Sequence, residues 1–285
     1  AYQQAQLSMG IFSPETISVG ELFAGALLPG LVLVGLYMLY LVLLAFLKPS
    51  LMPAAVQEPG DEVSFLTLLG LLAGPLLLIV AVLGSILMGL ATPTEAAAVG
   101  ATGAMLLALK QRQLSVETLR SVVYQSARVS AMVFMILIGA SLFSLVFRGY
   151  GGDEYVQSLL SNLPGGEAGA LLIVMLVLFL LGFILDFIEI TYVVIPIVGP
   201  VLLAMGIDPV WLGVLIAINL QTSFLTPPFG FSLFYLRGVA PPEIRTTAIY
   251  KGVIPFIVIQ LTMLGLLTLW PDLATWLPGV IYGAP

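Results

Sequence analysis

The chain has 285 residues, of which 60% are hydrophobic and only 8% are charged, and its formal net charge is -6. Soluble domains are roughly 45–50% apolar and about 25% charged, so water is excluded as the main environment of this chain. Its negative charge and nine Lys and Arg residues exclude nucleic acid as a partner, and the lack of Cys and His excludes thiolate or imidazole metal sites and His-based catalysis.

Several apolar stretches are long enough to cross a lipid bilayer, whose hydrocarbon core of about 30 Å needs about 20 apolar residues. The first stretch, residues 22–47, carries no charge and ends at Lys48, so we expect one transmembrane helix there. Residues 49–64 turn to Pro, Glu and Asp, which is typical of an extramembrane linker. The sequence therefore predicts an all-α polytopic membrane protein.

Two further apolar runs, residues 65–91 and about 94–109, are separated by a break. Thr92 before Pro93 predicts a helix N-cap with proline at the first helical position. Glu95 then falls in the first turn, where the helix dipole favours an anion. This gives Glu95 a sufficient structural explanation, and a functional role is the alternative.

Two cation-rich segments predict the orientation of the chain. Residues 110–128 hold four cations and one acid, and residues 237–251 hold three cations and one acid. Because cytoplasmic loops carry an excess of Lys and Arg, both segments are predicted to be cytoplasmic loops. The final transmembrane helix, residues 252–270, is followed by aromatic residues and no cation, which predicts that the C-terminus lies outside.

Three apolar blocks lie between these cationic segments. Residues 129–147 and 209–236 each suit one crossing, whereas residues 168–207 would make about 60 Å of helix, twice the core thickness. Because both cationic segments are predicted to be cytoplasmic, the chain must cross the membrane an even number of times between them. This holds if residues 168–207 form a re-entrant hairpin that enters and returns on one side, with its turn near residues 185–191. Two full spans joined by a charged turn also keep the number of crossings even, and the sequence does not distinguish the hairpin from the two spans.

The segment 219–230, Asn-Leu-Gln-Thr-Ser-Phe-Leu-Thr-Pro-Pro-Phe-Gly, lies in the middle of a stretch without charge. Pro227 and Pro228 lack N–H donors, and Gly230 lets the backbone turn, so we expect an unwound helix near the bilayer midplane. Irregular backbone at that depth persists where protein buries it or where it lines a wet cavity, as in carriers that bind ions and substrate there.

Polar side chains in this segment add oxygen atoms to the freed carbonyls: Asn219, Thr222, Ser223 and Thr226. Hard oxygen ligands suit an alkali cation better than a transition metal, so the pattern favours an ion- or substrate-binding site. The alternative is a kinked helix whose Ser and Thr side chains only bond to the neighbouring backbone.

Asp186 and Glu189 are the only acids within residues 168–207. An ionisable group at membrane depth is unfavourable unless it faces a cavity, a cation or a partner. Three positions apart on a helix, the two carboxylates would share a face. They are therefore candidate ion ligands or proton carriers, and a hydrated turn is the alternative.

With these motifs in hand, the chain resembles the large membrane subunit of tripartite ATP-independent periplasmic (TRAP) transporters, closest to the mannitol/chloroaromatic-type branch. The resemblance rests on Ala-Thr-Pro-Thr-Glu-Ala-Ala-Ala-Val-Gly at 91–100, Gly-Phe-Ile-Leu-Asp-Phe-Ile-Glu-Ile at 182–190 and Leu-Gln-Thr-Ser-Phe-Leu-Thr-Pro-Pro-Phe-Gly at 220–230, and it spans the entire chain.

The resemblance implies an elevator-type carrier of the bacterial inner membrane, built from two inverted repeats, each with a hairpin and an unwound helix. It implies a sodium ion as the coupling ion with no further cofactor, an organic acid as the solute, and a small membrane subunit and a periplasmic solute-binding protein as partners. Asp186 to Thr191 would then form the second hairpin tip, residues 222–230 the second unwound segment, and Asp186, Thr222 and Thr226 a sodium site.

The chain departs from the family pattern in two respects. Family members are longer, so we expect residues 1–48 to hold the end of the first repeat and one helix, residues 65–285 to hold the second repeat, and the chain to carry about half of the binding site. Other branches often place a small residue after Asp186, where this chain has Phe187, so Glu189 does not carry over directly as a ligand.

Two other functions are consistent with parts of the pattern. Proton coupling through Asp186 and Glu189 would replace sodium coupling, and a non-transporting membrane scaffold would leave the midplane break without a purpose. An intramembrane hydrolase is excluded, because an aspartyl protease needs a second membrane Asp and a metalloprotease needs His. The sequence thus predicts a carrier subunit and no enzyme.

Overall fold

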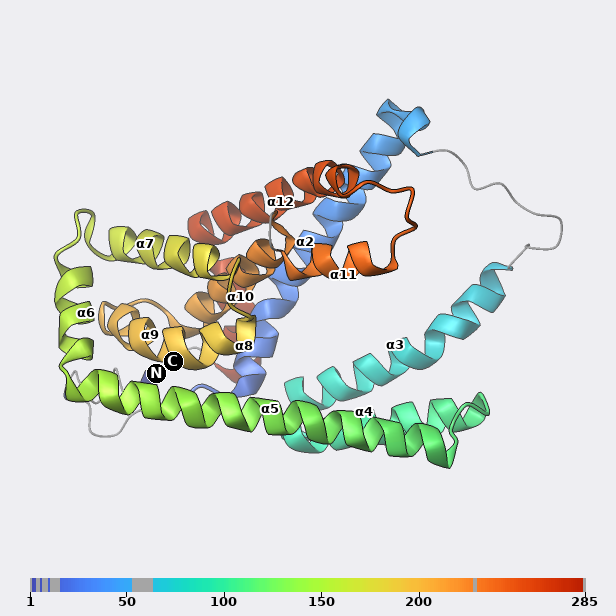
Figure 1. Ribbon diagram of the computed structural model, residues 1–285, viewed down its shortest axis with the longest axis horizontal. Helices are drawn as coiled ribbons and strands as arrows, with labels where there is room; N and C mark the ends of the chain where they lie inside the picture. The colour runs from blue at the N-terminus through green and yellow to red at the C-terminus, as the bar shows by residue number, and fades with distance from the viewer. Residues whose placement is uncertain are drawn as a thin grey trace.

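The computed structural model describes residues 2–3, 6, 10, 16–52, 64–227 and 230–283, and every regular element in these ranges is a helix (Figure 1). Among them, 5 helices are long and apolar enough to cross a membrane: α2 (Val19–Leu47), α3 (Phe65–Leu87), α5 (Val116–Gly149), the continuous helix Phe187–Ala204 and α12 (Thr246–Leu269). The predicted all-α polytopic membrane protein is confirmed.

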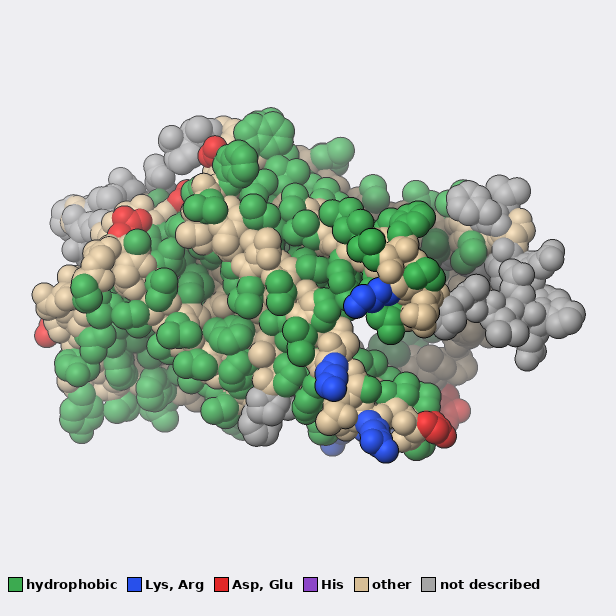
Figure 2. All heavy atoms as spheres, turned by 90° about the horizontal axis from the view of Figure 1, so that it is seen from above, with side chains coloured by type: hydrophobic (Ala, Val, Ile, Leu, Met, Phe, Trp, Pro, Cys, Tyr) green, Lys and Arg blue, Asp and Glu red, His purple; other side chains and the backbone are tan. Residues whose placement is uncertain are grey.

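Apolar side chains cover much of the face shown in Figure 2. On α3 and α5, for example, Leu77 is 69% exposed and Phe134 is 66% exposed. Soluble monomers rarely expose apolar patches this extensive, because each exposed side chain forgoes the free energy of leaving water. Contact with lipid, or with another membrane subunit, gives these helices the apolar environment that they need.

One packed body contains most of the buried side chains. Its buried cluster includes Ile190 and draws on seven α-helices: α2, α6 (Gly152–Ser161), α7 (Gly166–Leu181), α9 (Ile195–Ala204), α10 (Pro209–Leu225), α12 and α13 (Asp272–Tyr282). α10 is central, because it packs against α2, α7 and α12 and most of its side chains are buried. The indole Nε1 of Trp211 donates a 2.8 Å hydrogen bond to the Leu267 carbonyl, which joins α10 to α12.

Three helices lie beside this body. In the described parts of α3, α4 (Pro93–Lys110) and α5, only Ile86, Ala96 and Ala140 are buried. α3 packs against α4 and also contacts α2 of the body, and α5 runs along the body and contacts it near residues 190–194 and at α6 (Figure 1). The chain is thus divided into a well-packed body and a loosely attached set of helices.

The cap predicted at Thr92 is present at the start of α4. The Glu95 amide donates to Thr92 Oγ1 at 3.4 Å, and Glu95 Oε2 accepts from the Thr92 amide and hydroxyl, both at 2.8 Å. The backbone bond, and then the hydroxyl bond, stabilise the charged carboxylate and lower the pKa of Glu95. The predicted cap is therefore formed, and because α4 packs chiefly against α3, it lies outside the buried body.

The cation-rich segment 110–128 is mostly helical, so its prediction as a loop is wrong. α5 begins at Val116, where the Ser115 hydroxyl accepts a 3.0 Å bond from the Thr118 amide, and only residues 111–115 connect it to α4. α5 has 34 residues, about 51 Å of helix, which exceeds one crossing of a core of about 30 Å. The prediction for 129–147 therefore captured only part of this helix.

The end of the chain also holds more helix than predicted. α12 begins at Thr246 rather than at residue 252, and α13 follows it and packs along α2, whereas the sequence predicts no helix after residue 270. Most of the predicted linker at 49–64 lies outside the described residues, apart from the short 3₁₀ turn η1 (Pro49–Leu51) and the flanking positions.

Residues 168–207 form two helices separated by a break. α7 has 16 residues, and after residues 182–186 a continuous helix runs from Phe187 to Ala204 through α8 (Phe187–Glu189), a π-helical turn η2 (Ile190–Val194) and α9. The second helix has 18 residues, about 27 Å, and α7 contacts both η2 and α9. Hairpin and two-span arrangements share this pattern, so the re-entrant hairpin stays a prediction.

Candidate ion and solute site

The first helix break lies at residues 182–186, between the end of α7 and the start of α8 at Phe187. Asp186 adopts an extended conformation as the N-cap, and its Oδ1 accepts a 2.7 Å bond from the Phe187 amide. Glu189 follows in the first turn and is half-buried, whereas Thr191 is exposed within the π-helical turn. π-Helical turns are rare and are frequent at functional sites, and sequence periodicity did not indicate this one.

The second helix break lies between α10 and α11 (Phe231–Val239). α10 ends at Leu225, Thr226 is extended, and the Gly230 amide donates a 3.1 Å bond to the Thr226 carbonyl. A Cβ at Gly230 would lie 2.4 Å from the Phe224 carbonyl oxygen, so only glycine permits this close turn. The unwound segment predicted here is present; Pro227 is half-buried, and Pro228 lies outside the described residues.

The two breaks meet. A Cβ at Gly182 would lie 2.1 Å from Ser223 Oγ, so the end of α7 touches the last turn of α10 directly. The ring of Phe224 contacts Phe187 on one side and Phe231 on the other, with centroids 6.0 Å and 5.7 Å apart. One aromatic chain therefore links the start of α8, the end of α10 and the start of α11.

Thr222 and Ser223 of α10 are buried, Thr226 just after its end is half-buried, and all three hydroxyls bond to the backbone. The hydroxyls of Thr222 and Thr226 donate to the carbonyls four residues earlier at 2.7 and 2.8 Å, and Ser223 donates to Leu220 at 2.8 Å. The kinked-helix alternative predicts these bonds too, but each hydroxyl oxygen keeps lone pairs that can coordinate a cation.

Asn219 holds α10 against the first broken segment. Its side chain is 3% exposed, and its Nδ2 donates a 2.8 Å bond to the Met175 carbonyl of α7. This bond leaves the amide oxygen of Asn219 available for a ligand. The same bond would also serve simply to hold the two helices together. Asn219 thus fixes the position of α10 relative to α7, just before the two breaks.

The junction of the breaks combines charges that suit small ions. The C-terminal ends of α7 and α10 carry partial negative charge, as carbonyl groups without helical partners gather there. Asp186 adds a carboxylate at the start of α8, where its neighbour Phe187 contacts Phe224 near the end of α10. No group of three or more His, Cys, Asp or Glu side chains forms a transition-metal site in the described part of the chain.

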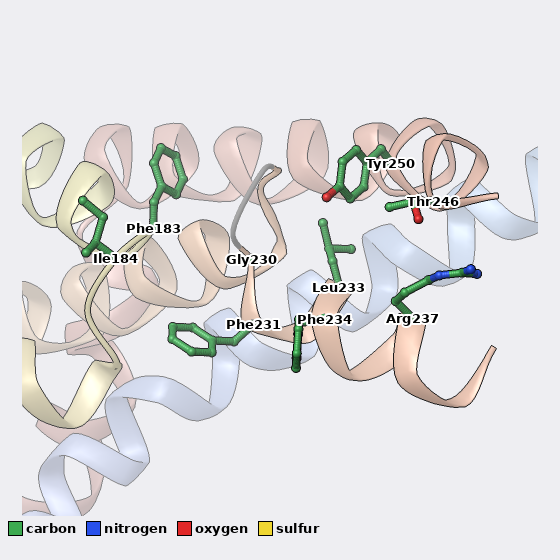
Figure 3. A pocket seen from close by; sticks show the side chains of 9 residues that line it. All are labelled: Phe183, Ile184, Gly230, Phe231, Leu233, Phe234, Arg237, Thr246 and Tyr250. Atoms are coloured by element: carbon green, nitrogen blue, oxygen red, sulfur yellow. The ribbon is translucent and has the colours of Figure 1, made fainter.

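A pocket of about 540 Å³ opens beside the junction (Figure 3). It is lined from three directions by the first break, by the second break with α11, and by the start of α12: Phe183, Ile184, Gly230, Phe231, Leu233, Phe234, Arg237, Thr246 and Tyr250. The sequence did not single out Arg237 or Tyr250, because both fall in the segment predicted as a cytoplasmic loop. The sequence feature that could have indicated Arg237 as a site residue is its position, seven residues after Gly230.

Comparison with known protein families identifies the family of this chain. The family described as "Tripartite ATP-independent periplasmic transporter, DctM component" matches residues 7–273. The chain belongs to this family. Its members are TRAP transporter components and not enzymes, as predicted.

Curated TRAP permeases are also similar in sequence. The chain is 31% identical over 201 residues to an isethionate TRAP transporter permease of Oleidesulfovibrio alaskensis, covering 70% of this chain and 31% of the relative. It is 31% identical over 207 residues to a C4-dicarboxylate TRAP large permease of Rhodobacter capsulatus, covering 72% and 47%. A sialic acid TRAP large permease of Vibrio cholerae is 27% identical over 205 residues, covering 72% and 48%. The chain spans half or less of the length of these TRAP relatives.

Proposed function

We propose that the protein carrying this chain is the translocation subunit of a TRAP transporter that imports a small organic acid across the bacterial inner membrane, driven by a sodium gradient. The observation that carries this proposal is the contact between two helix breaks at Gly182 and Ser223. Helix breaks at membrane depth persist where protein buries them or where they line a wet cavity, and carriers use such breaks to bind ions and substrate.

Sodium is the coupling ion favoured by the ligand atoms. Asp186 supplies the carboxylate, Thr222 and Thr226 supply hydroxyl oxygens, and the carbonyl ends of α7 and α10 add partial negative charge. An ion bound there would join both breaks and order them together. Proton coupling through Asp186 and Glu189 is the competing proposal.

The organic acid and the partners follow from the relatives, whose names describe permeases for isethionate, C4-dicarboxylates and sialic acid. We extend the tripartite assembly of the family to this protein, with a small membrane subunit and a periplasmic solute-binding protein. The division between a packed body and loosely attached helices supports an elevator motion, in which the body carries the site past a scaffold formed by α3, α4 and α5. The C-terminus would then lie in the periplasm.

Reconstituted uptake tests the proposed function. The full-length protein carrying this chain is placed in liposomes with its small membrane subunit, and its solute-binding protein is supplied outside with a panel of radiolabelled organic acids. An inward sodium gradient should drive accumulation, whereas an equal potassium gradient should not. Accumulation that follows an imposed pH gradient in sodium-free medium would contradict sodium coupling and favour the proton carrier.

A further inference from the structure

The two ends of the pocket beside the junction differ in polarity. Phe183 and Ile184 line one end, and Arg237 and Thr246 line the other, with Leu233 and Tyr250 pointing toward each other between them (Figure 3). The apolar end therefore lies next to the helix breaks, and the polar end lies away from them. Its volume of about 540 Å³ is in the range of sites for small organic ligands.

Arg237 is the only cation that lines this pocket, within the part of the chain that the structure describes. It lies in the last turn of α11, and one guanidinium nitrogen donates to the Ile244 carbonyl, which fixes the side chain across the α11–α12 connection. A guanidinium group has five N–H donors arranged to hold a carboxylate in two parallel bonds. No described carboxylate forms an ion pair with Arg237, so its charge has no partner of this kind within those residues.

The remaining lining is mainly aromatic. Phe183 comes from the first break, Phe231 and Phe234 both come from the start of α11, and Tyr250 of α12 adds a fourth ring with a hydroxyl group. Such rings favour contact with a flat apolar group through area burial and offset or edge-on packing. A ligand with two carboxylates would place its second charge among these rings without a cation, which is unfavourable.

We infer that this pocket binds an amphipathic organic monoanion, with its carboxylate on Arg237 and an apolar, preferably aromatic, body directed toward the helix breaks. This inference rests on the proposed function, because it names the class of solute that the translocation site accepts. Arg237 also agrees with the cationic bias of cytoplasmic loops, but that bias alone gives no reason for the side chain to line an aromatic pocket.

Equilibrium binding tests the inference. The full-length protein with its small subunit is purified in detergent, and radiolabelled benzoate is titrated in sodium-containing buffer, with succinate and benzyl alcohol as competitors. Benzoate should bind, and both competitors should be at least about tenfold weaker. Arg237→Gln should weaken benzoate binding about 10- to 100-fold, as expected for a hydrogen-bonded charge pair, with partial recovery in Arg237→Lys.

Two further variants keep this test independent of folding. Arg245→Gln removes an exposed cation from the same connection outside the pocket and should bind benzoate normally. Phe234→Ala changes a rim side chain that is 77% exposed and should weaken benzoate about 3- to 10-fold by loss of aromatic contact. Stronger binding of succinate than of benzoate, or unchanged binding in both Arg237→Gln and Phe234→Ala, would overturn the inference.

The failure of this inference is distinguishable from failure of the proposed function. Sodium-driven uptake of an acid that ignores Arg237→Gln would overturn the monoanion pocket and leave the carrier intact. Benzoate binding that depends on Arg237, without uptake under any gradient, would overturn the carrier and leave the pocket. A photoreactive group at position 234 that captures phospholipid, and is not displaced by benzoate, would show an acyl-chain site and overturn the inference.

Discussion

Gly182→Ala is expected to destabilise the protein by about 1–3 kcal/mol and to reduce sodium-driven uptake sharply, because it forces the two helix breaks apart. The new Cβ would lie 2.1 Å from Ser223 Oγ and 2.7 Å from Ser223 Cβ, and Ser223 is fully buried. A rotamer change moves only the Oγ, so the backbone of α7 or α10 must shift. Thermal unfolding of the detergent-purified protein, together with reconstituted uptake, measures both effects.

Two variants identify the contact that is responsible. Ser223→Gly removes both atoms that the new Cβ would meet, so the double variant Gly182→Ala/Ser223→Gly should recover much of the lost uptake, less the roughly 1 kcal/mol effect of glycine in a helix. Gly139→Ala adds a Cβ on α5, where nothing lies within 4 Å, and should leave stability unchanged or slightly raised. Equal damage from Gly182→Ala and Gly139→Ala would contradict the close contact of the breaks.

Asp186→Asn is expected to weaken the apparent sodium affinity of uptake about 10- to 100-fold with little change in stability. Asparagine retains a side-chain oxygen that can accept the Phe187 amide, and Asn and Asp are similarly good N-caps. The substitution therefore removes the negative charge while keeping the local structure. Uptake measured against sodium concentration separates a loss of affinity from a loss of folded protein.

Asp208→Asn is the matched control for this charge removal. Asp208 is also a helix N-cap, with its Oδ1 accepting a 2.8 Å bond from the Trp211 amide, but it lies at the opposite end of α10 from the break. Its sodium dependence should match that of the unmodified protein. If Asp186→Asn and Asp208→Asn show the same sodium curve, Asp186 is a structural cap and the assigned sodium site is wrong.

The sequence predicted those features that depend on local chemistry. Thr92 and Pro93 form the expected helix start, and the break near Thr226 and Gly230 is present because prolines and glycine act on the backbone nearby. The apolar runs likewise marked most of the helices, since length and hydropathy decide what can lie in lipid. The same reasoning misread residues 116–128, because charges on a helix that extends beyond the membrane core look like those of a loop.

The assembly of the site depends on contacts between distant segments, and a single sequence does not encode these visibly. Nothing in the spacing of Gly182 and Ser223 indicates that they touch, and the chain Phe187–Phe224–Phe231 joins three separate elements. Arg237 was predicted only as a loop cation, although it lines the pocket from α11. The sequence therefore identified both breaks as candidates, and the packing of α7 on α10 brings them together.

Sodium protection of a single cysteine beside Asp186 tests the central claim most directly, that an ion binds where the two breaks meet. The chain contains no Cys, so Phe187→Cys gives one thiol in it, at a position that is 48% exposed, and Leu159→Cys on α6 gives a control that is 46% exposed. Alkylation rates are measured in the reconstituted full-length protein, freed of cysteines elsewhere, in sodium and in potassium at equal ionic strength. Sodium should slow alkylation at position 187 and not at position 159, whereas equal rates at position 187 in both salts would contradict an ion site at the junction.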